Sequence, residues 1–315
     1  MIDLNVAAMQ YPTVLIIGGT GFIGGHLAAR LSATGRRVIL PTRRATRARR
    51  FSVLPTVEVI EANVHDAAVL AQLVARADAV INLVGVLHSG RGKAGSAYGP
   101  AFAAAHVELP KKIVAACRQA GVRRYLHMSA LGASSNGSSM YLRSKADGEA
   151  VALDPALDTT IFRPSVVFGP DDKFLNLFAG LQSVFPIMPL GGADARFQPV
   201  FVGDVATAFV HALENPSTFG RLYELGGPRI YTLRELVRMA GELSGHARPV
   251  IGLPPALARL QALALEWMPG GPLMSRDNLD SMRQDNVLNA AMAPELDLVP
   301  TALESVAPGY LGRRP

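Results

Sequence analysis

An apolar, β-branched run that leads directly into regularly spaced glycines constrains this chain more than any other feature. Residues 14–17 read Val-Leu-Ile-Ile, and Gly18, Gly21 and Gly24 follow. The next residues carry apolar side chains at helical spacing. This order of strand, glycine turn and helix predicts a site where first-turn N–H groups and the helix dipole face an anion, such as a dinucleotide pyrophosphate.

Each glycine has its own physical role in that turn. Gly18 lets the chain turn sharply off the strand, Gly21 places no side chain against the phosphates, and Gly24 lets the helix approach the sheet closely. A glycine turn that is present for packing alone is the alternative. The predicted cofactor contacts in the turn are Gly18, Thr20, Gly21, Phe22, Ile23 and Gly24.

The end of the second predicted strand favours NADP(H) over NAD(H). An NAD site commonly has an acid there that accepts hydrogen bonds from the ribose 2′-hydroxyl, but the sequence has no Asp or Glu between Arg36 and Arg50. Arg43 and Arg44 can instead bind a 2′-phosphate through charge-assisted hydrogen bonds. The alternative is that both arginines only contribute to a solvated surface.

Strand and helix patterns alternate through the first half of the chain, which predicts an α/β fold built on a Rossmann-type, doubly wound parallel sheet. The predicted strands are Val14–Ile17, Val38–Leu40, Val57–Ile60, Ala79–Leu83, Arg124–Met128 and Thr159–Phe162. The predicted helices are Phe22–Ala33, Ala67–Ala75, Val107–Ala120 and Met140–Ala152. Residues 85–100 are rich in Gly and Ser, and we expect a mobile loop over the carboxyl ends of the strands.

The pattern changes after Pro164, where Pro and Gly become frequent. We expect residues 1–165 to form the NAD(P)-binding Rossmann domain and 166–315 to form mostly a smaller, interleaved substrate lobe. A helical pattern within about 199–215 is expected to return to the first domain. Thr232 and Glu235 form a capping box that opens a helix ending near Leu243.

Further cofactor contacts follow from position after the predicted strands. Asn63 and Val64 are placed to border the adenine, and Leu83, Val84 and Gly85 are placed to pass beneath the adenosine ribose. Pro164, which ends the sixth predicted strand, completes the set.

Three residues carry candidate chemistry. Ser129 ends the fifth predicted strand, and Tyr141 and Lys145 are four residues apart, which places them on one face of a helix. A tyrosine is a poor base with its ordinary pKa near 10, but a nearby ammonium and a cationic nicotinamide favour the phenolate. Tyr141 can then exchange a proton with a substrate oxygen while hydride is transferred, Lys145 can also bind the nicotinamide ribose, and Ser129 can bond the same oxygen. The alternative is an ordinary helix face.

These residues resemble a known group of proteins. Thr20–Gly24 with Ser129, Tyr141 and Lys145 is similar to the extended or atypical short-chain dehydrogenase/reductase superfamily, which includes epimerase/dehydratase-like proteins. A closer resemblance, over about residues 13–290, is to bacterial relatives of the NADPH-binding accessory subunit of respiratory complex I. The segments that carry it are 141–149, 162–165, 168–176, 197–205 and 223–228.

The resemblance implies two alternatives. Most superfamily members are NAD(P)-dependent reductases, dehydrogenases or epimerases, whereas the complex I subunit holds NADPH without turning it over. The bacterial relatives are linked to NADH:quinone oxidoreductase or to quinone synthesis. Many members also carry an Asn that supports a proton-relay water where this chain has His106, so His106 is the candidate substitute. We therefore expect either an NADP(H)-dependent oxidoreductase acting on a small or quinone-like molecule, or a respiratory accessory or assembly protein; a regulatory NADP(H) sensor is a third option.

Composition excludes several other classes. The net charge is +6, but aromatic residues are not interleaved with the basic cluster, so we expect no nucleic-acid partner. The single cysteine, Cys117, excludes a disulfide framework, and no ligand spacing indicates a metal site. The N-terminus lacks a signal-peptide pattern, so we expect a cytoplasmic protein. Residues 255–268 have helical apolar spacing, for which core packing is the default; peripheral association with the inner face of the membrane or a respiratory complex is the alternative. A homodimer is a further option.

Overall fold

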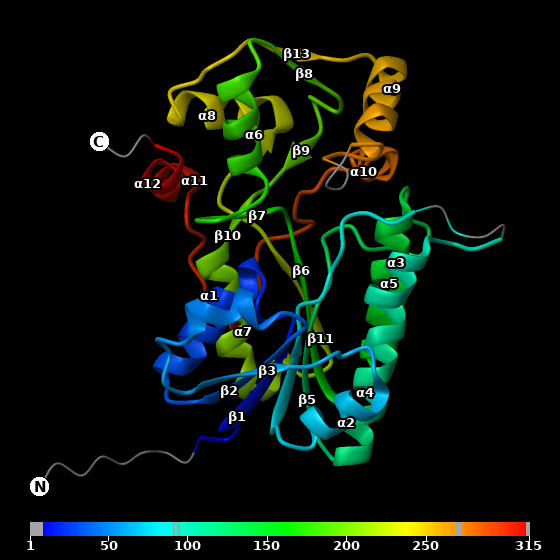
Figure 1. Ribbon diagram of the computed structural model, residues 1–315, viewed down its shortest axis with the longest axis vertical. Coiled ribbons are helices and arrows are strands. Elements are labelled where there is room, and N and C mark those ends of the chain that lie inside the picture. The colour runs from blue at the N-terminus through cyan, green and yellow to red at the C-terminus, as the bar shows by residue number, and fades with distance from the viewer. Residues whose placement is uncertain (1–8, 91, 93–94, 269–272, 313–315) are drawn as a thin grey trace, which may run out of the picture.

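A seven-stranded parallel sheet forms the larger part of the structure. The computed structural model describes residues 9–90, 92, 95–268 and 273–312, except for the side chains of Ala45 and Arg47. The strands are β1 (Thr13–Ile17), β2 (Arg37–Thr42), β3 (Val57–Glu61), β4 (Ala79–Asn82), β5 (Arg124–Met128), β6 (Asp158–Pro164) and β11 (Arg221–Leu225). They lie in the order β11-β6-β5-β4-β1-β2-β3, and every neighbouring pair is parallel (Figure 1). The predicted Rossmann-type fold class is confirmed.

Helices cover both faces of this sheet (Figure 1). Val14 and Ile16 of β1 belong to one core cluster and Leu15 and Ile17 to another, because successive side chains of a strand point to opposite faces. A strand buried on both faces must be apolar throughout, which explains the continuous run in β1. One face is covered by α1 (Phe22–Ala33) and α7 (Val202–Glu214), the other by α2 (Ala67–Val74), α4 (Leu109–Ala120) and α5 (Met140–Ala152).

A smaller lobe follows the carboxyl end of β6 and has its own core around Phe168, Leu236 and Leu303 (Figure 1). Its strands form two-stranded pairs: β10 with β7, β12 with β9, and β13 with β8. The strands are β7 (Val167–Phe168), β8 (Met188–Leu190), β9 (Arg196–Phe197), β10 (Val200–Phe201), β12 (Tyr231–Thr232) and β13 (Val250–Gly252). The helices are α6 (Leu175–Val184), α8 (Leu233–Leu243), α9 (Pro255–Glu266), α10 (Arg276–Ser281), α11 (Leu303–Val306) and α12 (Pro308–Leu311).

Two elements differ from the sequence-based expectation. Strand β11 was not predicted; it pairs with β6 at the sheet edge, where its polar residues and half-exposed Leu222 obscure the apolar pattern. The helix expected from Val107 begins earlier, with α3 (Pro100–Phe102) and a π-helical turn over Ala103–Glu108. Small residues there give little periodic signal. Residues 91, 93 and 94 of the expected mobile loop, and 1–8 of the expected first domain, lie outside the described residues.

Candidate functional site

The glycine turn lies where β1 leads into α1, next to the switch in strand order between β1 and β4. Gly18 has a φ of +82°, and a Cβ there would lie 3.1 Å from the backbone of Leu83 and Val84. A Cβ at Gly24 would lie 2.5 Å from the Cα of Gly19. Gly21 caps α1 without a side-chain hydrogen bond, and the first turn has no acidic residue. The turn is thus tightly packed against the chain after β4 and against Gly19. The amides at the start of α1 have no acidic residue of the first turn beside them.

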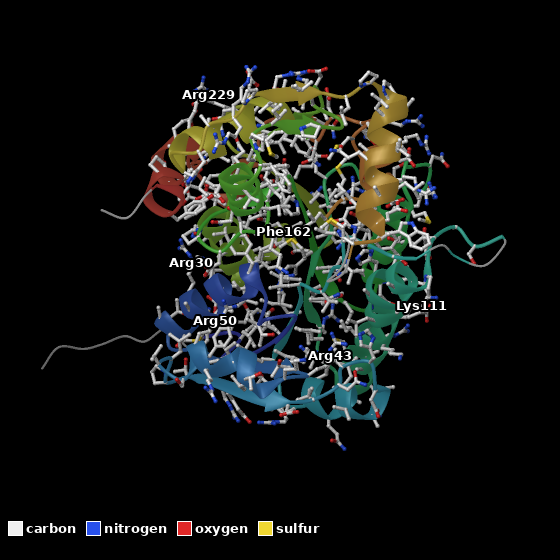
Figure 2. All side chains as sticks on the ribbon, turned by 45° about the horizontal axis from the view of Figure 1, so that its top comes forward. Arg30, Arg43, Arg50, Lys111, Phe162 and Arg229 are labelled. Carbon is white, nitrogen blue, oxygen red and sulfur yellow. The ribbon has the colours of Figure 1, made fainter. Side chains whose placement is uncertain are left out.

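Arg43, Arg44 and Arg50 follow β2 in the sequence, and Figure 2 labels Arg43 and Arg50. Arg50, at the end of a 3-10 helix over Ala45–Phe51, donates hydrogen bonds to the carbonyl oxygens of Thr20 (3.0 Å) and Gly21 (2.7 Å). The sequence did not single out Arg50, because nothing local indicates a contact across 29 residues. Arg43 and Arg44 are exposed, and among the described residues no carboxylate lies within ion-pair distance of either. They remain available to an anion.

The residues predicted after β3 and β4 follow the carboxyl ends of these strands. Asn63 is exposed and its Oδ1 accepts a hydrogen bond from the His65 N–H, while Val64 packs partly on the core. The Leu83 N–H donates to the Ile17 carbonyl, which joins β4 to β1. A Cβ at Gly85 would lie 3.4 Å from Lys145 Nζ. The chain after β4 therefore connects the glycine turn to the candidate catalytic helix.

Ser129, Tyr141 and Lys145 gather at the carboxyl end of β5. The buried Lys145 Nζ donates to the Met128 carbonyl at 3.1 Å, next to Ser129, and lies 6.0 Å from the centre of the Tyr141 ring. Ser129 is buried, and its Oγ has no hydrogen-bond partner among the residues that the structure describes. A buried hydroxyl without a partner is costly unless a ligand or water completes it. The structure thus brings the three residues together around an incomplete polar site.

Burial dominates the electrostatics of this site. It lowers the pKa of Lys145 to about 8, and the nearby Glu149 carboxylate opposes the change. Glu149 is itself held by two hydrogen bonds from Arg163. Burial also raises the pKa of Tyr141 well above its usual value. Without a further cation, Tyr141 is therefore a neutral phenol that can donate a proton.

His106 lies in the π-helical turn and hydrogen-bonds both to the chain after β4 and to helix α5. Its Nε2 accepts a hydrogen bond from the Val86 N–H (3.1 Å), so in the neutral ring Nδ1 carries the hydrogen and donates to Ser144 Oγ (2.8 Å). Ser144 Oγ in turn donates to the Tyr141 carbonyl. Burial, reinforced by the charge of Lys145, lowers the pKa of His106 to about 2. Both ring nitrogens are occupied, so His106 connects two elements and offers no free nitrogen to a relay water.

The Tyr141 ring is positioned by aromatic contacts. It packs edge-on against Phe102 and His106, with ring centres 5.9 Å and 5.6 Å away. The π-helical turn approaches α5 so closely that a Cβ at Gly148 would overlap the His106 carbonyl oxygen. π-helical turns often occur at functional sites because they redirect side chains within a helix.

Asp277 of α10 was missed by the sequence-based prediction. Its carboxylate accepts hydrogen bonds from the backbone N–H groups of Met140 (2.7 Å) and Tyr141 (3.1 Å), the first residues of α5. Burial raises the pKa of Asp277, and these two amides oppose the change. The C-terminal lobe therefore caps the helix that carries Tyr141 and Lys145. No local pattern could have indicated a partner 136 residues away.

These features fit an adenine dinucleotide. A Cβ at Gly24 would overlap Gly19, Gly18 has a positive φ and is tightly packed, Ser129 Oγ has no partner among the described residues, and Arg43 and Arg44 after β2 are exposed. Within the described part of the chain, no group of three or more His, Cys, Asp or Glu residues could hold a metal ion. His127, also buried on β5, hydrogen-bonds to Tyr125 OH (2.9 Å).

Comparisons with known proteins agree with this description. The sequence profile of the NAD dependent epimerase/dehydratase family matches residues 14–226. An Arabidopsis thaliana protein, NADH dehydrogenase [ubiquinone] 1 alpha subcomplex subunit 9, mitochondrial, is 30% identical over 94% of this chain and 76% of its own length. A ceramide reductase of Caulobacter vibrioides is 31% identical over 81% of this chain and 78% of its own length. The crystal structure of Pal from Bacillus thuringiensis has the same fold, with a TM-score of 0.74 at 16% identity over 95% of this chain and 97% of that one.

Proposed function

Because the chain belongs to the NAD dependent epimerase/dehydratase family, we propose that it is an NADP(H)-dependent oxidoreductase acting on a small or quinone-like carbonyl compound. The observation that carries the proposal is the incomplete polar site near Lys145 and Tyr141, where the buried Ser129 Oγ has no partner within the described part of the chain. A relative named ceramide reductase supports assigning a reduction to this chain.

The chain's own residues act on the substrate oxygen. NADPH held at the glycine turn would supply the hydride that reduces the carbonyl carbon. The neutral Tyr141 phenol gives its proton to the carbonyl oxygen, which becomes a hydroxyl, and the Lys145 ammonium stabilises the resulting phenolate. Ser129 donates a hydrogen bond to the same oxygen, which satisfies a hydroxyl that otherwise lacks a partner.

Cofactor preference is assigned to Arg43 and Arg44. A 2′-phosphate beside these exposed guanidinium groups gains charge-assisted hydrogen bonds. We expect Arg43→Ala/Arg44→Ala to weaken NADPH binding about tenfold or more and to leave NADH binding nearly unchanged in calorimetric titrations. Arg37→Ala is the matched control, because Arg37 lies at the amino end of the same strand, away from the carboxyl end that Arg43 and Arg44 follow. Equal losses for both cofactors would remove the preference.

Replacing Tyr141 tests the reaction. We expect Tyr141→Phe to retain NADPH binding but to reduce NADPH oxidation at least about a hundredfold, because the proton donor is gone. Tyr11→Phe serves as the control, since Tyr11 precedes the amino end of β1, whereas the candidate site lies at the carboxyl ends of the strands. A panel of carbonyls and quinones, followed by NADPH absorbance, provides the measurement. Unchanged oxidation in Tyr141→Phe with every active substrate would refute the assigned role.

A second candidate is a protein that holds NADPH without turnover as an accessory or assembly factor of the respiratory NADH:quinone oxidoreductase. Two observations favour it: the Arabidopsis relative carries the name of an NADH dehydrogenase subunit, and His106 has both ring nitrogens engaged. Tight NADPH binding together with no oxidation in the isolated protein, and co-purification with the membrane complex, would favour this candidate over the enzyme.

A further inference from the structure

Helix α9 is amphipathic, but its large apolar side chains face away from the protein, unlike those of an ordinary surface helix. The side that faces the body carries Ala258, Gln261 and Ala262, whereas the outward side carries Leu257, Leu260, Leu263 and Trp267. Leu260 is 62% exposed and Trp267 is 83% exposed. The expectation that this apolar spacing serves core packing is therefore wrong. The periodicity predicted the helix, but the large apolar side chains point away from the protein.

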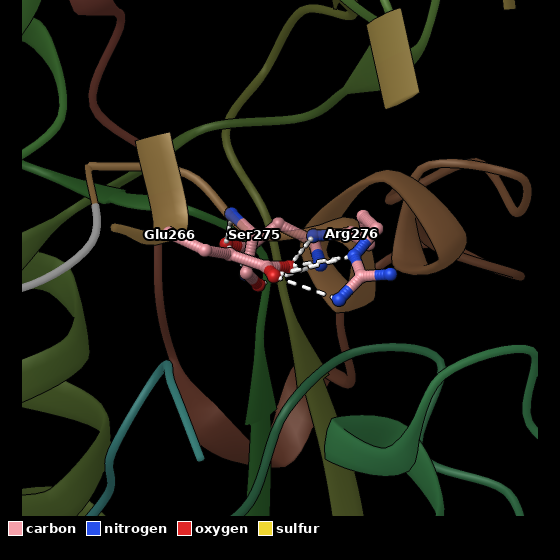
Figure 3. A network of polar contacts seen from close by, with 4 residues as sticks. Glu266, Ser275 and Arg276 are labelled. Atoms are coloured by element: carbon pink, nitrogen blue, oxygen red, sulfur yellow. Dashed lines mark hydrogen bonds and ion pairs between the residues drawn. The ribbon is translucent and has the colours of Figure 1, made fainter. Parts of the chain in front are cut away.

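Polar contacts fix the rotation of α9 about its axis. Gln261 Nε2 donates to the Pro189 carbonyl (2.7 Å) and its Oε1 accepts from the Gly191 N–H (3.2 Å). At the end of the helix, Glu266 accepts hydrogen bonds from both the backbone and the guanidinium of Arg276 (Figure 3). Ala258 would contact a Cβ at Gly191, so this side of the helix lies close to the lobe. Turning the leucines inward would break these contacts.

Other exposed apolar side chains lie at the same end of the molecule. α9, β13 and the end of α6 occupy the top of Figure 1. Ile251 of β13, Val184 at the end of α6, and Phe185 and Ile187 just after it are all exposed. Arg248 precedes β13 and donates to the Gln182 carbonyl, and Arg259 lies on the flank of α9 at 3.9 Å from Asp280; both side chains are exposed. One end of the lobe thus carries several exposed apolar side chains together with two exposed arginines.

We propose that the outward face of α9, defined by Leu257, Leu260, Leu263 and Trp267, lies in the surface of a lipid bilayer that contains anionic headgroups. A projecting helix with leucines and a tryptophan on one side fits the boundary between headgroups and acyl chains. Arginines on the flanks can reach anionic headgroups while their stems remain against apolar groups. Within the described residues no helix is both long and apolar enough to cross a membrane, so the contact is interfacial.

This site is independent of NADP(H) binding and turnover, and the sequence provides its own probe. Trp267 is the single tryptophan of the 315 residues and lies on the proposed face. We expect its fluorescence emission to shift to shorter wavelengths when vesicles of phosphatidylcholine and phosphatidylglycerol are added. Brominated phosphatidylcholine should quench this emission, and the protein should float with the vesicles. Vesicles of phosphatidylcholine alone should bind less protein, because the arginines then lack anionic partners.

Leu260→Gln/Leu263→Gln is the decisive variant. It keeps Trp267 and the polar contacts of α9, and Gln is a good helix former, so circular dichroism should be unchanged. We expect the partition coefficient to fall at least about tenfold. The matched control is Val53→Gln/Val299→Gln, which replaces two exposed apolar residues elsewhere and should bind like the wild type.

Three results would overturn the proposal. The first is an unchanged emission with no flotation of the wild-type protein. The second is equal binding by the Leu260/Leu263 variant. The third is an emission shift that grows with protein concentration in the absence of vesicles, which would assign this face to a second copy of the chain.

Discussion

Strand β5 has a buried cation near each end, and the two are satisfied very differently. Arg124 begins the strand, and its guanidinium donates to five acceptors, namely the carbonyls of Asp158, Ala212 and Leu213 and the hydroxyls of Thr160 and Thr218. Lys145 lies beside the other end, and among the described residues its ammonium donates to the Met128 carbonyl. Burial lowers the pKa of Arg124 to about 10 and that of Lys145 to about 8.

The difference separates a structural cation from one that is available to a ligand. Arg124 joins β5 to β6 and to the end of α7, so its charge is distributed over fixed backbone oxygens. Lys145 has three N–H donors and, within the described residues, one protein acceptor, so it retains donors for a bound molecule. The same sheet thus has one end completed by the protein and one end that a ligand would complete.

The largest expected effect is on stability at the completed end. Arg124→Met should lower the free energy of unfolding by about 3–5 kcal/mol, because several buried acceptors lose their donor at once. Urea unfolding followed by circular dichroism provides the measurement. Arg123→Met is the control: Arg123 is the preceding residue, and its exposed side chain pairs with Asp158, so the loss should be much smaller. Equal losses would show that Arg124 is no more structural than a surface cation.

At the carboxyl end of β5, where Lys145 lies, we expect a substitution to raise the free energy of unfolding. Lys145→Met removes a buried charge that has one acceptor, so the free energy of unfolding at pH 7 should rise by about 1–2 kcal/mol. NADPH-dependent turnover should fall at least about a hundredfold. Lys111→Met, which changes an exposed lysine on α4, should alter neither quantity. A loss of stability in Lys145→Met comparable to that of Arg124→Met would break the comparison.

The pH dependence of stability sharpens this prediction. The pKa of Lys145 is lowered from 10.5 to about 8 by burial, so the unfolded chain binds more protons between these values. The free energy of unfolding of the wild type therefore increases as the pH rises through this range, because Lys145 loses its buried charge. The advantage of Lys145→Met should be complete below pH 8 and shrink toward pH 10.5. Parallel urea unfolding of both proteins across this range tests it, and an advantage that does not change with pH would contradict it.

A smaller effect is expected from the cap on α5. Asp277→Asn weakens the hydrogen bonds to the Met140 and Tyr141 amides and should cost about 1 kcal/mol. Amide hydrogen exchange at these two residues should accelerate, while exchange in β5 should not change. Asp280→Asn on the same helix is the control, because the carboxylate of Asp280 lies 3.9 Å from the two arginines that it faces among the described residues. Unchanged exchange in Asp277→Asn would mean that the lobe does not support the helix that carries Lys145.

Local sequence patterns predicted the strands, turn and helix of the site better than the long-range contacts between them. The β1 run, the glycine turn and the four-residue spacing of Tyr141 and Lys145 each depend on neighbours in sequence, so the pattern alone located them on a strand, a turn and a helix. Arg50 and Asp277 depend on contacts across 29 and 136 residues, for which the sequence carries no local signal. The edge strand β11 escaped prediction because it is only half buried.

Sequence periodicity determined that residues 14–31 form a strand, a glycine turn and a helix, and that Pro255–Glu266 forms a helix, because hydrophobic spacing and backbone freedom act over a few residues. Tertiary structure decided which side of each element meets the protein. Gln261 and Glu266 hold α9 with its leucines outward, and Lys145 is left with a single acceptor while Arg124 has five. Hydrogen bonds between distant segments set these outcomes, and such bonds exist only after the chain has folded.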